Sequence, residues 1–171
     1  MQKMTSAYAN KMLKSLEEDK AFWVNKEEAS STYVVANNEE PVVPEYDYLQ
    51  VANTIAEIDE KIMVIKHALN VANATAKVMV GDIEMSIDTI LIRMAQLNKR
   101  KNVLDIMRKR LPKAREEQRS YMSRNTVPEY RYINYDLDLI KKEYEAVSKA
   151  IMEMQMALDR YNQTVQFEVN M

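Results

Sequence analysis

The side chains best suited to chemistry in this sequence are the basic ones between residues 93 and 131. That stretch holds twelve Lys or Arg residues and four Asp or Glu residues, although the whole chain has a formal net charge of −2. Guanidinium and ammonium groups bind phosphate and carboxylate oxygens, and nearby tyrosines could stack on bases. The basic stretch could therefore bind a small anionic, nucleotide-like ligand, or dock on acidic segments within or between chains; we do not expect nucleic acid as a partner. The acidic segments concerned contain Glu17, Glu18, Asp19, Glu39, Glu40 and Glu45.

The candidate ligand-binding residues combine basic side chains with two amides. Lys101 and Arg108 stand where a helical seam should be apolar, so each must reach solvent, a subunit contact or an interior ligand. Asn70 and Asn73 stand where a helix is expected to end, so they could cap it or form a polar pocket with Arg100. The candidate set for an anion is Asn70, Asn73, Arg93, Arg100, Lys101 and Arg108.

Residue types that many enzymes need are scarce. The sequence has no cysteine, one histidine and one glycine, which argues against thiolate metal sites, a Ser-His triad and glycine-rich phosphate loops. His67 has no carboxylate three or four residues away, so it lacks the partner of a helical metal half-site. Glu57 and Glu60 share an outward helical face with Lys61. We therefore predict no catalytic residue, no metal, no cofactor and no enzymatic activity.

Four segments with helical periodicity must position these side chains. From Leu137 to Val165, and again from Val51 to Ala72, apolar residues recur at alternating spacings of three and four. That spacing is typical of a coiled-coil seam. The sequence predicts helices at about 3–31, 46–72, 87–111 and 136–165.

The breaks between these segments predict their connections. Residues 37–47 contain two prolines and several acids, which predicts an extended linker. The β-branched residues around Gly81 predict a β-hairpin over residues 76–86, and residues 118–135 predict a long loop that could include a strand. The expected fold is one all-α domain over residues 1–171, an antiparallel bundle of long coiled-coil hairpins with one small β-hairpin.

Seams this regular also suit contact between chains, so we expect a homo-oligomer. No apolar run approaches the roughly 18 residues of a membrane span, and no hydrophobic signal core begins the sequence. We therefore expect a cytoplasmic protein without a membrane partner. It would act as a non-enzymatic assembly or interaction protein, and the alternative is a binder of small anions at subunit interfaces. The predicted oligomer seam comprises Ile55, Ile58, Ile62, Ile65, Ile151, Met154 and Leu158.

Several short motifs, in this order, resemble a bacterial family of small helical proteins, some of which carry the label septicolysin. The motifs are the linker YVVANNEEPVVPEYDYL, the helix end LNVANATAKV, the helix SIDTILIRMAQLNKR and the loop VPEYRYINYDLDL. Asn70, Asn73 and Arg100 match family positions, whereas Met94 and Ala95 replace an Arg-Asp pair. The resemblance implies an antiparallel helical fold, a small hairpin and oligomers, without an assigned reaction. The label adds a membrane-active toxin as a further alternative.

Overall fold

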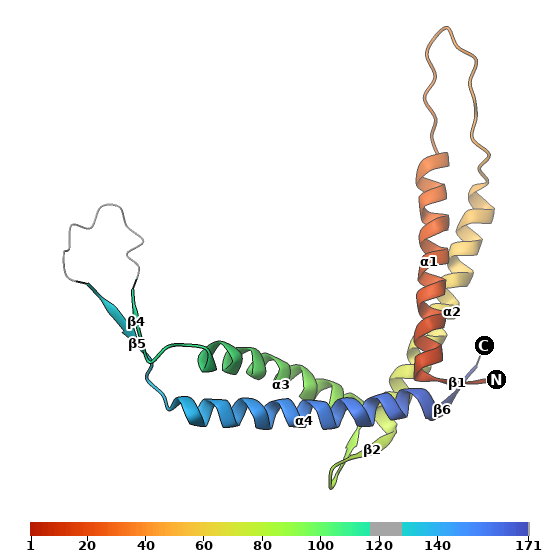
Figure 1. Ribbon diagram of the computed structural model, residues 1–171. Helices are drawn as coiled ribbons and strands as arrows, with labels where there is room; N and C mark the ends of the chain where they lie inside the picture. The colour runs from red at the N-terminus through yellow and green to blue at the C-terminus, as the bar shows by residue number, and fades with distance from the viewer. Residues whose placement is uncertain (117–127, 171) are drawn as a thin grey trace.

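The computed structural model describes residues 1–116 and 128–170, in which four helices form two hairpins. We call α1 (Ser6–Ser30) with α2 (Tyr48–Thr75) the first arm. We call α3 (Ile87–Arg108) with α4 (Leu137–Thr164) the second arm. The arms meet at one end and extend in different directions, so the molecule has the shape of an L (Figure 1). The predicted, mostly helical class is confirmed.

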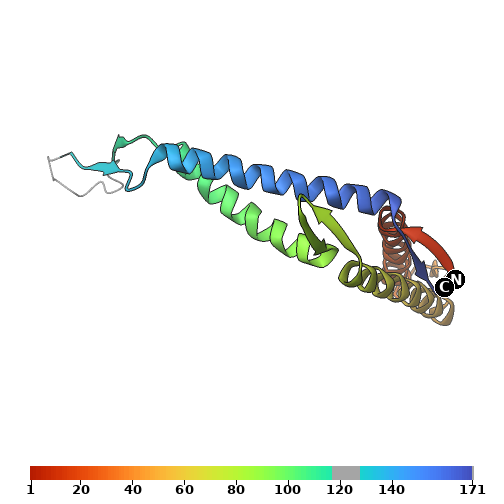
Figure 2. The ribbon, with the colours of Figure 1, turned by 90° about the horizontal axis from the view of Figure 1, so that it is seen from below.

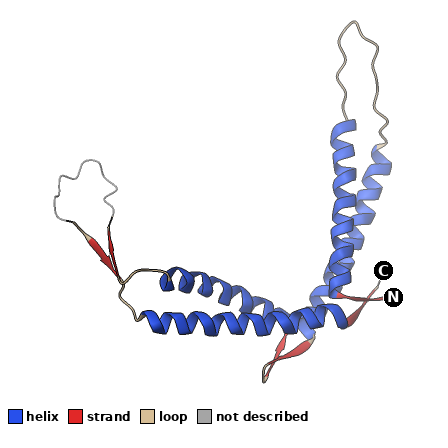
Figure 3. Cartoon of the chain, viewed as in Figure 1, coloured by secondary structure: helices blue, strands red, loops and turns tan. Residues whose placement is uncertain are grey.

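Three two-stranded antiparallel sheets complete the described fold (Figure 3). The first sheet joins residues near both ends of the sequence at the meeting point of the arms, which we call the elbow, and it pairs Gln2 with Val169. The second is a hairpin between α2 and α3, and the third lies at the far end of the second arm. The strand pairs are β1 (Gln2–Thr5) with β6 (Gln166–Val169), β2 (Lys77–Val80) with β3 (Ile83–Ser86), and β4 (Lys113–Arg115) with β5 (Tyr130–Tyr132).

Polar side chains set where the helices begin. The Oγ1 atom of Thr5 accepts a hydrogen bond from the backbone N–H of Tyr8 at 3.2 Å. The Oδ1 atom of Asp47 accepts one from the N–H of Gln50 at 3.1 Å. Each bond satisfies an N–H that the first helical turn leaves without a partner. The first helix consequently begins at Ser6, whereas the sequence had predicted residue 3, and the preceding residues form β1.

Other predicted bounds also differ from those observed. The third helix ends at Arg108, short of the predicted residue 111, because Pro112 disfavours helical geometry in the residue before it. The hairpin predicted over 76–86 is observed as β2 and β3, with Gly81 at φ +57° in the turn. The loop predicted over 118–135 contains β5 (Tyr130–Tyr132), and its residues up to 127 lie outside the described part. The pairing of β1 with β6 was not predicted.

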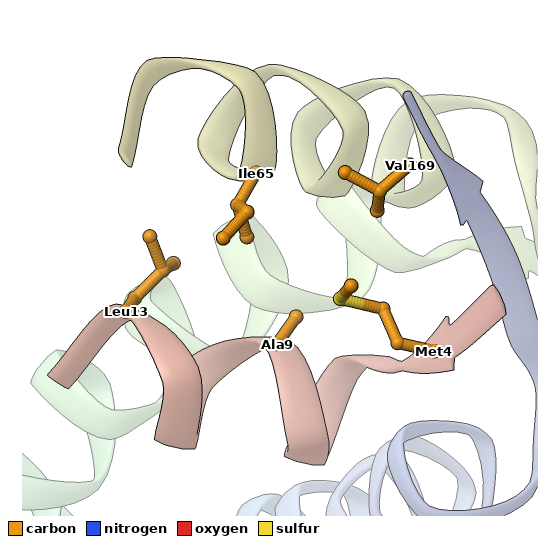
Figure 4. Packing of buried hydrophobic residues seen from close by; sticks show 5 residues of the cluster. All are labelled: Met4, Ala9, Leu13, Ile65 and Val169. Carbon is orange, nitrogen blue, oxygen red and sulfur yellow. The ribbon is translucent and has the colours of Figure 1, made fainter. Parts of the chain in front are cut away.

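Each arm has its own hydrophobic core. Figure 4 shows the first, where Ile65 of α2 faces Ala9 and Leu13 of α1 and is joined by Met4 and Val169 from the elbow sheet. Seen from below, α3 and α4 lie side by side and carry the second core between them (Figure 2). The second core comprises Ile87, Ile90, Met154, Leu158 and Tyr161. Because the two sets share no residue, each arm is packed around separate apolar contacts.

Candidate functional site

The two basic residues that interrupt the third apolar seam share one aromatic ring. The guanidinium carbon of Arg108 lies 4.0 Å from the ring centre of Tyr144, and Nζ of Lys101 lies 5.6 Å from it. A cation near an aromatic face is attracted by the negative potential of the ring. Because Tyr144 belongs to α4, these contacts join the two helices of the second arm. Lys101 and Arg108 thus have a partner within one chain, and their expected role at a subunit contact stays a prediction.

Asp105 balances the charge at the end of α3. Its Oδ1 accepts a hydrogen bond from Nε of Arg108 at 2.8 Å, and its Oδ2 accepts one from Nζ of Lys109 at 2.5 Å. The hydrogen bonds from Lys109 and Arg108 hold the pKa of Asp105 below its usual range. The bond to Asp105 in turn raises the pKa of Arg108. The charge of Arg108 is therefore already paired within α3.

The six candidate anion ligands are distributed over α2 and α3, and of these Lys101 and Arg108 meet at Tyr144. Asn70 and Asn73 lie inside α2, which continues to Thr75, so neither caps the helix as its position had suggested. Arg100 lies thirteen residues beyond the start of α3, about 20 Å along a helix with a rise of 1.5 Å per residue. Arg93 is exposed and donates a hydrogen bond to its own helix neighbour Gln96 at 3.4 Å. Neither of the two grooves described below, within residues 1–116 and 128–170, is lined by one of these six side chains, and their role as anion ligands stays a prediction.

The predicted seam residues lie between helices of the same chain. Ile65 belongs to the first core, and Met154 and Leu158 belong to the second. The others are buried or half-buried on α2 or α4: Ile55, Ile58, Ile62 and Ile151. These apolar residues thus contribute to the packing of the two arms. Their role in an oligomer stays a prediction.

His67 is exposed on α2. It lines an open groove of about 680 Å³ between α2 and β6, together with Met63, Val71 and Phe167. No group of three or more His, Asp or Glu side chains in the described residues is placed to hold a metal ion. The chemistry of this groove is mainly apolar.

The far end of the second arm carries three basic side chains, Arg110, Lys113 and Arg115, which we call the basic tip. None of the three forms an ion pair with another residue in the described ranges. Nζ of Lys113 lies 4.2 Å from the ring centre of Tyr130 and 5.5 Å from that of Tyr132. The ammonium group of Lys113 therefore contacts the two tyrosine rings of β5. It has no carboxylate partner among the described residues.

A groove of about 300 Å³ opens at the basic tip. Arg131 lines this groove and donates to both carboxylate oxygens of Glu116, at 2.7 and 2.5 Å, and this pairing raises the pKa of Arg131. Nearby, the Tyr135 hydroxyl donates to the backbone oxygen of Met107 at 2.7 Å and fixes the chain after β5 to α3. The groove is lined by Arg110, Leu111, Ala114, Arg131, Tyr132 and Ile133. The groove therefore combines apolar side chains with two guanidinium groups.

The far end of the first arm is acidic. From residue 31 to residue 47 the chain has four carboxylates and no Lys or Arg. We call Glu39, Glu40 and Glu45 the acidic tip; all three are exposed, and none forms an ion pair with a described residue. At its base the Tyr46 hydroxyl donates to Oε1 of Glu27 at 3.2 Å, and desolvation together with this bond raises the pKa of Tyr46. Of the other predicted acidic partners, Glu17 is already paired with Lys66 at 2.9 Å and Glu18 with Lys14 at 3.8 Å.

Apolar side chains in the same connection also face solvent. Val42 is 90% exposed and Val43 is 60% exposed, between Pro41 and Pro44. The sequence predicted an extended linker here but gave this pair of valines no role. The available signal was their position between two prolines, which keeps them out of any helix.

Comparisons with known proteins support the fold only. No family model and no curated protein matches the sequence. The structure is similar to the crystal structure of a functionally unknown conserved protein from Corynebacterium diphtheriae. The TM-score is 0.66 at 13% sequence identity, and the match covers 98% of this chain and 100% of the other. The resemblance to the septicolysin-labelled family stays a prediction.

Among the described residues, none of the helices combines the length and the apolar character that crossing a membrane requires.

Proposed function

We propose that this chain is a non-enzymatic protein that works by assembling with copies of itself. The observation that carries the proposal is its accessible surface of 13281 Å². A compact monomer of 20.0 kDa exposes about 8,700 Å² by the usual scaling of surface with mass. The L shape therefore leaves an excess of about half that area, and a second copy could cover part of it.

The size of this excess is sufficient for stable association. A typical specific interface buries about 800 Å² on each partner. The excess of about 4,600 Å² over the compact value is several times larger. Exposed apolar side chains on helix surfaces contribute to it, among them Ile92 and Ile106 on α3 and Met152 and Met156 on α4. Self-association would withdraw such groups from water.

We further propose that the two arms are coiled-coil hairpins. On α2 the residues Val51, Ile58 and Ile65 are buried at intervals of seven, as the core positions of a heptad repeat are. Ion pairs flank this stripe, with Lys20 and Asp59 at 2.6 Å. Rigid arms of this kind suit a building block because they keep their ends at a fixed separation.

The test is the molar mass in solution, measured by light scattering coupled to size exclusion over a hundredfold range of protein concentration. We expect a molar mass of at least two chains of 20.0 kDa each. A monomer at every concentration would overturn the proposal. A thermal-shift assay with a panel of nucleotides on the same sample separates assembly from anion binding, because a ligand that binds the folded state raises the Tm. A rise of several degrees with one nucleotide would favour the ligand-binding alternative.

A further inference from the structure

We propose that the acidic connection of one copy docks in the groove at the basic tip of a second copy. The occupant is residues 39–45, with the sequence EEPVVPE, and the receptor is the groove beside β4 and β5. This inference rests on the proposed self-association and names the surfaces that carry it.

The charges of the two tips are complementary in sign and in number. Glu39, Glu40 and Glu45 form no ion pair with a described residue, and the same holds for the three side chains of the basic tip. Opposite charges across an interface orient the partners and exclude docking of like-charged surfaces. Contact between the tips would give both sets the partners that they lack within one described chain.

The apolar groups of the two tips also match. Val42 and Val43 are exposed at the middle of the acidic segment, with carboxylates on both sides. The groove is lined by apolar side chains, among them Leu111 and Ile133, and by the guanidinium groups of Arg110 and Arg131. Seating the two valines against these apolar side chains would bring the flanking carboxylates towards the basic side chains. A combination of apolar and charged contacts of this kind is common in specific protein interfaces.

The backbone of the occupant is already extended. Pro41 and Pro44 restrict the segment to conformations near polyproline II, and no helix or strand includes it. A segment with restricted conformations loses less entropy when it binds. At its start, the N–H of Glu39 donates to the backbone oxygen of Ala36 at 3.1 Å in the turn after which the chain runs back towards α2 (Figure 1).

One chain cannot make this contact with itself. The connection between α1 and α2 lies at the end of the first arm, and β4 and β5 lie at the end of the second, with the full length of both arms between them (Figures 1 and 2). The occupant must therefore come from a second copy. A contact between two different surfaces is heterologous, so it produces a closed ring or an open chain of subunits.

The test uses two charge-reversed variants of the full chain. The connection variant carries Glu39→Lys, Glu40→Lys and Glu45→Lys, and the tip variant carries Arg110→Glu and Arg115→Glu. All five side chains are exposed and outside both cores, so folding should persist, as circular dichroism would verify. In each variant alone, the connection and the basic-tip groove carry charges of the same sign. We therefore expect its self-association to weaken by at least about tenfold. In an equal mixture, the connection of each variant can dock on a groove of opposite charge in the other variant. Assembly should therefore return.

A matched control carries Lys11→Glu and Arg160→Glu, which are exposed positions on α1 and α4 near the elbow and away from both tips. It makes the same change in net charge as the tip variant and should assemble like the unmodified chain. If the unmodified chain assembles and both tip-directed variants assemble equally well, the docking inference is wrong while the proposed self-association stands. If the unmodified chain is monomeric at every concentration, both proposals fail together.

Discussion

Tyr144 shows how the interior of the second arm accommodates charge. Lys101 and Arg108 occupy seam positions, and a bare cation there would lose hydration without compensation. The aromatic ring supplies a negative face, and Asp105 supplies a carboxylate to Arg108 at 2.7 Å. The sequence revealed that both cations need partners, because they interrupt the apolar spacing. It could not reveal Tyr144 as the partner, because the contact depends on the alignment of α3 with α4.

Replacing Tyr144 tests this contact. We expect Tyr144→Leu to lower the free energy of unfolding by about 1 kcal/mol more than Tyr144→Phe, since phenylalanine keeps the ring and leucine does not. Urea denaturation followed by circular dichroism at equal protein concentrations measures the difference. Equal losses in the two variants would show that the ring contributes by its volume alone.

The paired state of Asp105 predicts a dependence on pH. Its folded-state pKa is lowered, so the pairing stabilises the fold above the ordinary value of about 3.9. The contribution is lost as pH falls through the lower folded value, where the carboxylate is protonated. We expect Asp105→Asn to have a lower Tm than the unmodified chain at pH 7, and the gap to close below about pH 4. Thermal melts from pH 2 to pH 7 measure it, and a constant gap would contradict the assignment.

At the scale of elements, local sequence signals predicted the helices, but they did not predict the pairing of strands that are far apart in the sequence. The heptad spacing is recognised within a few residues, so the helices lie close to their predicted bounds, whereas the N-caps Thr5 and Asp47 were not used to place the helix starts. β1 and β6 pair Gln2 with Val169, and strands of four residues with so distant a partner leave almost no local pattern. For the same reason the groove at the basic tip was not predicted: β4 and β5 meet across residues 116–129.

The turn between β2 and β3 gives a prediction for one element. Gly81 has φ +57°, and an added Cβ would meet no atom within 4 Å, so a substitution acts through backbone strain alone. We expect Gly81→Val to lower the free energy of unfolding by about 1–2 kcal/mol, and Gly81→Asn by less, because asparagine tolerates positive φ. Chemical denaturation of the two variants side by side measures this ordering. A valine variant as stable as the asparagine variant would contradict it.

At the scale of the whole molecule, two cores imply that the arms lose structure separately. Val169 is fully buried in the first core and contributes nothing to the second. An unpaired carboxylate at such a position costs several kcal/mol or is neutralised. We expect Val169→Asp to abolish hydrogen-exchange protection in β1 and β6 while the amides of α3 and α4 stay protected. The control is Gln166→Asp, an exposed position on the same strand, which should leave the elbow protected. Loss of protection along all four helices would show that the molecule is one cooperative unit.

The elbow also has a consequence for synthesis. β1 is made before α1 to α4 and its partner β6 after them, so the core around Met4 and Ile65 is complete only once Val169 has been added. Ninety-four residues separate Thr75, the end of the first arm, from Val169. At about 5–20 residues per second, the ribosome needs about 5–20 seconds to add them. During that interval the first arm presents an unfinished apolar surface, which makes it the part of the nascent chain that a holding chaperone would meet.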